Sequence, residues 1–78
     1  MSYHMLFVRD DGVWSPAFGD YERECVARER DDCWRASAHN APDDMRYRAR
    51  DMVIVAFSRV PSQRRVNDTA IRLILERG

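Results

Sequence analysis

The first sixteen residues carry a hydrophobic and polar pattern that is typical of a β-hairpin. Residues 3–9 (YHMLFVR) are rich in aromatic and branched side chains, which favours a strand. Asp10-Asp11-Gly12 follows, and an Asp-Gly pair favours a tight turn because both of its residues tolerate a positive φ. Val13-Trp14 is then predicted to be a short return strand that ends at Ser15-Pro16.

Two helices and one further strand are predicted after the hairpin. Asp20 is a favourable N-cap for a helix over residues 21–35, and the polar segment 36–44 is predicted to be a loop. Residues 52–57 (MVIVAF) form an uninterrupted apolar run, which is typical of a strand covered on both faces. A second helix is predicted to end at Arg77 and to begin at either Ser62 or Asn67.

This order of elements predicts an α+β fold. We expect a small antiparallel or mixed sheet, made of the N-terminal hairpin and one buried strand, covered by the two helices. The apolar strand 52–57 is expected at the centre of that sheet. A length of 78 residues predicts one domain, 1–78, with a thin core.

The net charge of zero conceals two oppositely charged halves. Residues 1–45 hold five arginines and ten acidic residues, a balance of −5, whereas residues 46–78 hold eight arginines and three acidic residues, a balance of +5. All thirteen basic residues are arginine. A neutral total is unlike that of most free-standing nucleic-acid binders, but this asymmetry indicates charged partners.

Acidic residues gather on one side of the first predicted helix. On a helical wheel Asp20, Glu24 and Asp31 share a narrow sector opposite an apolar stripe, while Glu22 and Glu29 fall within that stripe. Those two carboxylates either pair with arginines of residues 46–50 or reach water. With the neighbouring acids added, the candidate partner-binding residues are Asp10, Asp11, Asp20, Glu24, Asp31, Asp32, Asp43 and Asp44.

Aromatic residues are the candidate anchors of an interface. Trp14, Tyr21 and Trp34 are the aromatic side chains expected to act as such anchors. Trp34 points away from the apolar stripe, so it is either exposed or packed against the segment that follows the helix.

No motif in the chain predicts catalysis, a metal or a cofactor. Cys25 and Cys33 lie eight residues apart on one predicted helix, about 12 Å, which is too far for a disulfide. Neither they nor His4 and His39 have the spacing of a zinc site, and no phosphate-binding or nucleophile motif is present. We therefore expect a protein that is not an enzyme. The start of the chain has no signal-peptide or membrane-spanning pattern, which predicts a cytoplasmic protein.

Two segments resemble a family of small phage and prophage proteins. Residues 11–23 contain a W-S-x-x-F-G-D element ahead of an acidic helix, and residues 47–55 (YRARDMVIV) resemble the second strand of the same family. The size and acid-rich helix are similar to those of a type I-C anti-CRISPR protein. The resemblance implies a monomer in the cytoplasm of a bacterial host that inhibits by binding.

The partner implied by this resemblance is a subunit of the CRISPR surveillance complex with a positively charged DNA-binding surface. The acidic residues would imitate DNA there, without direct contact with nucleic acid or a membrane.

Two other functions remain open at this point. One is a small nucleic-acid-binding regulatory protein that uses the basic half of the chain, namely Arg46, Arg48, Arg50, Arg64 and Arg65. The other is a structural or assembly accessory of the virion or of the machinery by which a phage takes over its host.

Overall fold

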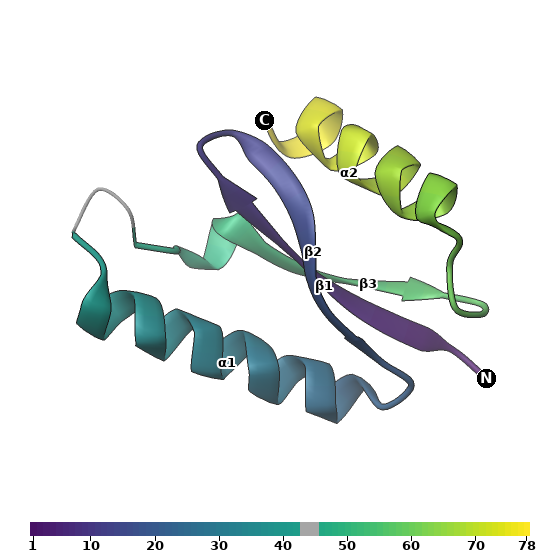
Figure 1. Ribbon diagram of the computed structural model, residues 1–78, viewed down its shortest axis with the longest axis horizontal. Coiled ribbons are helices and arrows are strands. Elements are labelled where there is room, and N and C mark those ends of the chain that lie inside the picture. The colour runs from purple at the N-terminus through teal and green to yellow at the C-terminus, as the bar shows by residue number, and fades with distance from the viewer. Residues whose placement is uncertain (43–45) are drawn as a thin grey trace.

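The computed structural model describes residues 1–42 and 46–78 and has an α+β fold (Figure 1). Its elements in chain order are β1 (Tyr3–Asp10), β2 (Val13–Asp20), α1 (Arg23–Asn40), the short 3-10 helix η2 (Ala49–Asp51), β3 (Met52–Phe57) and α2 (Gln63–Arg77). The predicted fold class is therefore confirmed. None of the helices in the described part of the chain is long and apolar enough to span a membrane.

The three strands form an antiparallel sheet in the order β2-β1-β3. The hairpin strand β1 is central, so the prediction that residues 52–57 occupy the centre was wrong: β3 is an edge strand. Its apolar run reflects the two helices that pack on opposite faces of the sheet. An uninterrupted apolar run reports that both faces are covered, and it carries no information about the position of a strand within the sheet.

The hairpin is longer than its turn and proline signals predict. Asp11 and Gly12 have φ values of 52° and 79°, which confirms the predicted tight turn. β2 then continues through Pro16 to Asp20, so its predicted end at Ser15-Pro16 was wrong. An edge strand tolerates a proline because its outer N–H groups need no partner. The register of the β1–β2 pairing also shifts between Leu6 and Phe7.

The alternation of side chains along β1 divides the interior into two small cores. Leu6 and Val8 face α1 and pack with Val26 and Met52. On the opposite face Phe7 packs with Trp14 and with residues of α2. The second core consists of Phe7, Trp14, Phe57, Val66 and Leu73. The sheet therefore separates α1 from α2, and β1 is shared by both cores.

The boundaries of α1 differ from the prediction at both ends. Glu22, not Asp20, is the N-cap, and the Asp20 carboxylate instead accepts a hydrogen bond from the Glu22 N–H at 2.8 Å. At the other end the helix continues to Asn40 through part of the predicted loop. The Ser37 hydroxyl accepts a hydrogen bond from the Tyr47 N–H at 2.8 Å, a tertiary contact to this last turn.

The second helix begins at the first of its two predicted starts. Ser62 is the N-cap of α2, and its hydroxyl accepts a hydrogen bond from the Arg65 N–H at 3.2 Å. At the other end Gly78 has a φ of 86° and its N–H donates to the carbonyl of Ile74.

Candidate functional site

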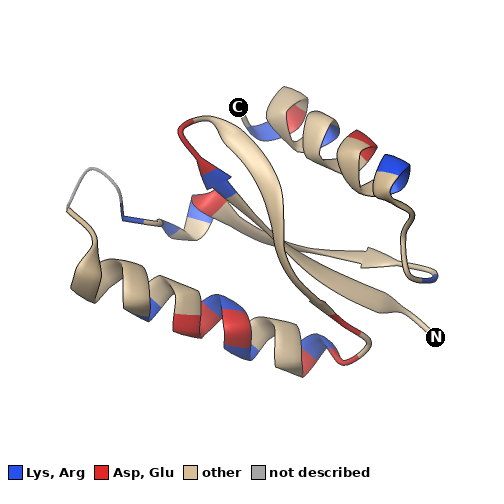
Figure 2. Cartoon of the chain, in the orientation of Figure 1, with Lys and Arg blue, Asp and Glu red and all other residues tan. Residues whose placement is uncertain are grey.

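The predicted acidic residues occupy three separate places in the fold (Figure 2). Asp10 and Asp11 lie at the hairpin turn, whereas Asp20 lies at the other end of the eight-residue strand β2. At 3.4 Å per residue those two ends are roughly 25 Å apart. Asp31 and Asp32 lie in the middle of α1, and Asp43 and Asp44 lie outside the described residues.

Several of these carboxylates are already engaged within the chain. Asp31 and Asp32 form ion pairs with Arg30 and Arg35, each with an N···O distance of 3.4 Å. Both pairs are exposed, so each contributes little to stability but neutralises local charge.

The acids of the hairpin and of the β2–α1 turn are less neutralised. Asp10 accepts a hydrogen bond from the Tyr47 hydroxyl at 3.0 Å. Asp11 and Glu24 are exposed and form no ion pair or hydrogen bond within the described part of the chain.

Arginines interrupt the acidic sector of α1. Arg28 lies one turn after Glu24, and Arg35 lies one turn after Asp31. Residues four apart on a helix are neighbours, so positive and negative side chains alternate along this outward face. That arrangement is typical of a solvated helix face. The structure therefore leaves small acidic corners rather than one acidic surface.

The structure also bears on the alternatives left open for Glu22, Glu29 and Trp34. Neither glutamate forms an ion pair with an arginine among the described residues, and Glu22 is exposed. Trp34 is 49% exposed, as is Tyr21 at 51%, whereas Trp14 is buried in the α2-side core. Of the three aromatic anchors expected from the sequence, two are therefore accessible.

The thiols and imidazoles form no reactive group in the described residues. Burial, together with the charges of Glu29 and Asp32, raises the pKa of the Cys33 thiol. Burial and nearby carboxylates likewise raise the pKa of Cys25. A raised pKa keeps both thiols protonated and weakly nucleophilic near neutral pH. No group of three or more His, Cys, Asp or Glu side chains suited to a metal occurs in the part of the chain that the structure describes.

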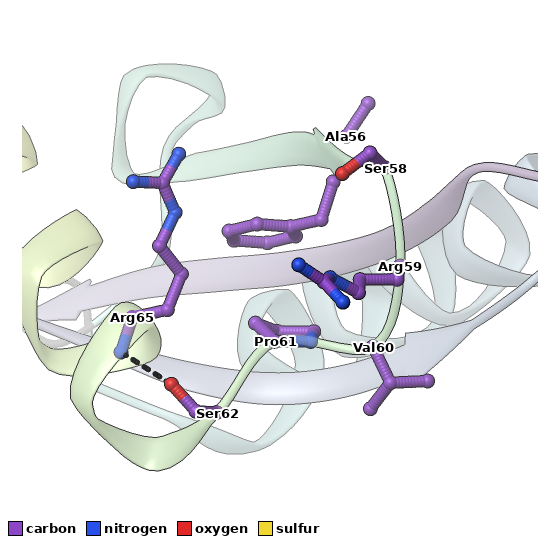
Figure 3. Close-up of a pocket in the computed structure, with 8 residues that line it drawn as sticks. Ala56, Ser58, Arg59, Val60, Pro61, Ser62 and Arg65 are labelled. Atoms are coloured by element: carbon purple, nitrogen blue, oxygen red, sulfur yellow. Dashed lines mark hydrogen bonds between the residues drawn. The ribbon is translucent and has the colours of Figure 1, made fainter.

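A basic pocket lies where β3 ends and α2 begins (Figure 3). We call it the β3–α2 pocket; its volume is about 650 Å³ and its lining residues are Ala56, Phe57, Ser58, Arg59, Val60, Pro61, Ser62 and Arg65. Arg59 and Arg65 lie on two sides of it. No acidic residue lines it, and neither arginine forms an ion pair within the described ranges 1–42 and 46–78.

The start of α2 adds further donors beside these two arginines. The Ser62 hydroxyl accepts from the Arg65 N–H and the Ser62 carbonyl accepts from the Val66 N–H. The N–H groups of Gln63 and Arg64 precede the first intrahelical bond, as at any helix start, and the helix dipole is positive there. The pocket is therefore lined by two guanidinium groups and lies beside a helix N-terminus, and both features favour an anion.

Sequence reasoning found only part of this pocket. It singled out Arg64 and Arg65 in a basic set with Arg46, Arg48 and Arg50, but Arg48 is the N-cap of η2 and Arg50 lies within η2, at the opposite end of β3. Arg59 was not singled out. The available signal was an arginine after an apolar strand and three residues before the Ser62 N-cap, a spacing that places Arg59 in the β3–α2 connection and Arg65 in the first turn of α2.

No known protein family, curated protein or solved structure matches the chain. The resemblance to small phage proteins therefore stays a prediction from residues 11–23 and 47–55.

Proposed function

We propose that the chain is a small nucleic-acid-binding regulatory protein whose β3–α2 pocket holds part of a sugar–phosphate backbone. The observation that carries this proposal is the placement of Arg59 and Arg65 on two sides of a pocket that contains no acidic residue. Guanidinium groups bind phosphate oxygens through two parallel hydrogen bonds, which favours arginine at such sites.

The neutral net charge does not oppose this function, because binding of a polyanion depends on the electrostatic potential at the binding site rather than on the total charge. Residues 58–65 contain three arginines and no acid, although α2 carries Asp68 and Glu76 further along the helix. A concave site lined by one sign of charge concentrates ligands of the other sign. This local excess of arginine would also orient the molecule, with the β3–α2 pocket toward the polyanion.

Fluorescence anisotropy with labelled single- and double-stranded oligonucleotides tests this function. The wild-type protein is expected to bind at low salt, with an affinity that falls steeply as salt rises. The double variant Arg59→Gln/Arg65→Gln should bind more weakly, and the slope of log K against log salt should fall by about 1 for each arginine.

The matched control is Arg23→Gln/Arg28→Gln, which removes the same amount of charge from exposed positions of α1. It should retain most of the affinity. Absence of binding to any oligonucleotide at low salt would contradict the proposal, and so would an equal loss in the two double variants.

A second candidate function is inhibition of a type I-C CRISPR surveillance complex by an acidic corner at the start of α1. The observation that favours it is that Glu22 and Glu24 are exposed, lack an arginine partner among the described residues, and closely follow the exposed Tyr21 in the chain. An accessible aromatic residue near carboxylates has the composition of an interface that contacts a basic surface.

Capture of the tagged protein by an assembled type I-C complex, with and without bound target DNA, tests this second function. Capture should be lost when DNA is already bound, and Glu22→Gln/Glu24→Gln should weaken it. The control Asp68→Asn/Glu76→Gln removes the same charge from exposed positions of α2 and should leave capture unchanged. Capture that is insensitive to both DNA and Glu22→Gln/Glu24→Gln would exclude this surface.

A further inference from the structure

The outward face of α2 carries three large apolar side chains. Ile71, Ile74 and Leu75 are 56%, 38% and 80% exposed, whereas Val66 and Leu73 on the inner face of the same helix are buried. The three exposed residues are spaced three and four positions apart, so they form one patch on the helix surface. We call it the apolar patch of α2. An apolar patch of this kind on the outer side of a helix is typical of a surface that a partner covers.

A row of charged side chains of alternating sign runs along α2 beside the apolar patch. Asp68 lies three residues before Ile71, and Arg72 lies three residues before Leu75, so the row and the patch are adjacent. Figure 2 shows the blue and red bands alternating along the helix. The members of this charged row are four residues apart in sequence: Arg64, Asp68, Arg72 and Glu76.

The side chains of the charged row are available to a partner. All four are exposed, and none of them forms an ion pair or a side-chain hydrogen bond within the described part of the chain. The exposed acids Asp31 and Asp32 of α1, by contrast, already pair with arginines of their own helix.

The alternating order makes the charged row complementary to its own copy when the two helices run in opposite directions. Asp68 then lies opposite Arg72 of the second copy, and in the same register Arg64 lies opposite Glu76 of the second copy. A two-fold axis repeats each contact, so this single register brings together four pairs of opposite charge. Two parallel helices in register would instead place like charges at the same level.

The same symmetry brings the two apolar patches together. A two-fold axis perpendicular to the plane of two antiparallel helices places each flank of a helix against the same flank of its partner. The charged row therefore meets the charged row, and Ile71 meets Ile71 of the second copy. Because the row holds two positive and two negative charges, it offers no net attraction to a polyanion, which favours a second copy of the chain as the partner.

We propose that two copies of this chain associate through the outward faces of their α2 helices, antiparallel and about a two-fold axis, with Asp68 opposite Arg72 of the second copy. This association is independent of the nucleic-acid-binding function proposed above, because the Arg59 and Arg65 side chains of the β3–α2 pocket form none of these pairs. One helix from each copy makes a small interface, so we expect a weak dimer that separates on dilution.

Charge reversal followed by sedimentation velocity over a range of protein concentrations tests the interface and its register. The wild-type protein should approach twice the mass of the chain as its concentration rises. Asp68→Arg places like charges opposite each other at both symmetry-related contacts, and so does Arg72→Asp. Each variant alone should therefore have a dissociation constant raised by about tenfold or more.

An equimolar mixture of the Asp68→Arg chain with the Arg72→Asp chain should restore association to near the wild-type level. In this mixture one chain is positive at both positions and the other is negative at both, so opposite charges meet again across the axis. A fold defect in either variant would persist in the mixture, so rescue reports the pairing itself.

Glu24→Arg is the matched control, because Glu24 is an exposed acid on α1 that precedes Arg28 by four residues, as Asp68 precedes Arg72 on α2. It should leave the dissociation constant unchanged, whereas Leu75→Ser should raise it by removing part of the apolar patch. A wild-type monomer at every concentration would overturn the proposal. So would unchanged association of Asp68→Arg, an equal loss in Glu24→Arg, or a mixture that associates no better than its two components.

Discussion

At the scale of single residues, Arg9 and Asp51 form the most buried ion pair in the described part of the chain. Their side chains are 18% and 15% exposed, and the Arg9 Nε donates to the Asp51 carboxylate at 2.9 Å. Arg9 also donates to the carbonyl oxygens of Arg77 and Gly78 at 3.1 and 2.6 Å. One guanidinium therefore joins the central strand to η2 and to the C-terminal end of α2.

The electrostatics of Asp51 show that this pair favours the folded state. Burial by itself would raise the pKa of Asp51, but the hydrogen bonds from the Arg48 N–H and from Arg9 outweigh it. The positive charges of Arg9 and Arg50 act in the same direction, so the pKa of Asp51 lies below its ordinary value. The ionised form is therefore stabilised by folding.

Replacing Asp51 with asparagine should destabilise the protein in a pH-dependent way. We expect a loss of about 1–3 kcal/mol in the free energy of unfolding near neutral pH. The stabilisation is present above the unfolded pKa, about 3.9, and is lost as pH falls through the lower folded value. Urea unfolding of Asp51→Asn and wild type across pH 2–7 should therefore give curves that converge in acid.

The variant Asp68→Asn is the control, because Asp68 is exposed and forms no ion pair in the described residues. Its effect should stay within about 0.5 kcal/mol at every pH. A constant offset between Asp51→Asn and wild type, undiminished in acid, would show that ionisation of Asp51 does not contribute.

Contacts of this kind explain why the role of single residues was hard to predict from the sequence. Asp10 was expected to bind a partner, yet it accepts a hydrogen bond from Tyr47, which lies 37 positions away. Burial and the hydrogen bond with Asp10 raise the pKa of Tyr47 to about 12. The number and sign of the charged residues can be read from the sequence. Their hydrogen-bond and ion-pair partners depend on which distant segments the sheet brings together.

At the scale of elements, two signals that depend on neighbouring residues were correct, whereas a third, the Asp20 N-cap, was wrong. Asp11-Gly12 forms the tight turn because its two residues adopt positive φ, and Ser62 caps α2 through a hydrogen bond three residues ahead. Both features require only short-range geometry. The ends of β2 and the place of β3 in the sheet depend on pairing partners and were mispredicted.

Removal of the α2 cap should lower stability by a predictable amount. Ser62→Ala deletes the hydroxyl that accepts from the Arg65 N–H, and we expect a loss of about 1 kcal/mol. For a domain of this size that corresponds to a fall of about 4–8 °C in Tm, measured by circular dichroism.

Ser58→Ala provides the comparison, because Ser58 is an exposed serine of the same pocket with no hydrogen bond among the described residues. Its Tm should change little. Equal shifts in the two variants would mean that the Ser62 hydroxyl does not act as a cap.

At the scale of the whole molecule, the division of the sequence into an acidic half and a basic half predicted little of where the candidate site lies. The acidic residues of 1–42 are distributed over the hairpin and α1. On α1, Arg28 and Arg35 lie between acidic residues and interrupt the negative charge. The arginines after residue 45 are divided among the two ends of β3 and the length of α2. A balance of −5 and +5 therefore becomes several small patches, and Arg59 and Arg65 are the two arginines that line the β3–α2 pocket.

The two cores should unfold together, because the central strand contributes to both. Leu6 and Val8 of β1 face α1, and Phe7 between them faces α2. Val26 and Val66 are buried valines of the two helices, one in each core. Truncation of either to alanine should cost about 1.5–3 kcal/mol and lower the Tm of one shared transition.

Two spectroscopic probes can distinguish shared from separate unfolding of these cores. In a Trp34→Phe background the fluorescence of Trp14, which is 2% exposed, reports the α2 side, while far-ultraviolet circular dichroism reports both helices. Coincident curves are expected for Val26→Ala and for Val66→Ala. If Val26→Ala lost helical signal before Trp14 became exposed, α1 would be an independent unit and β1 would not couple the two faces.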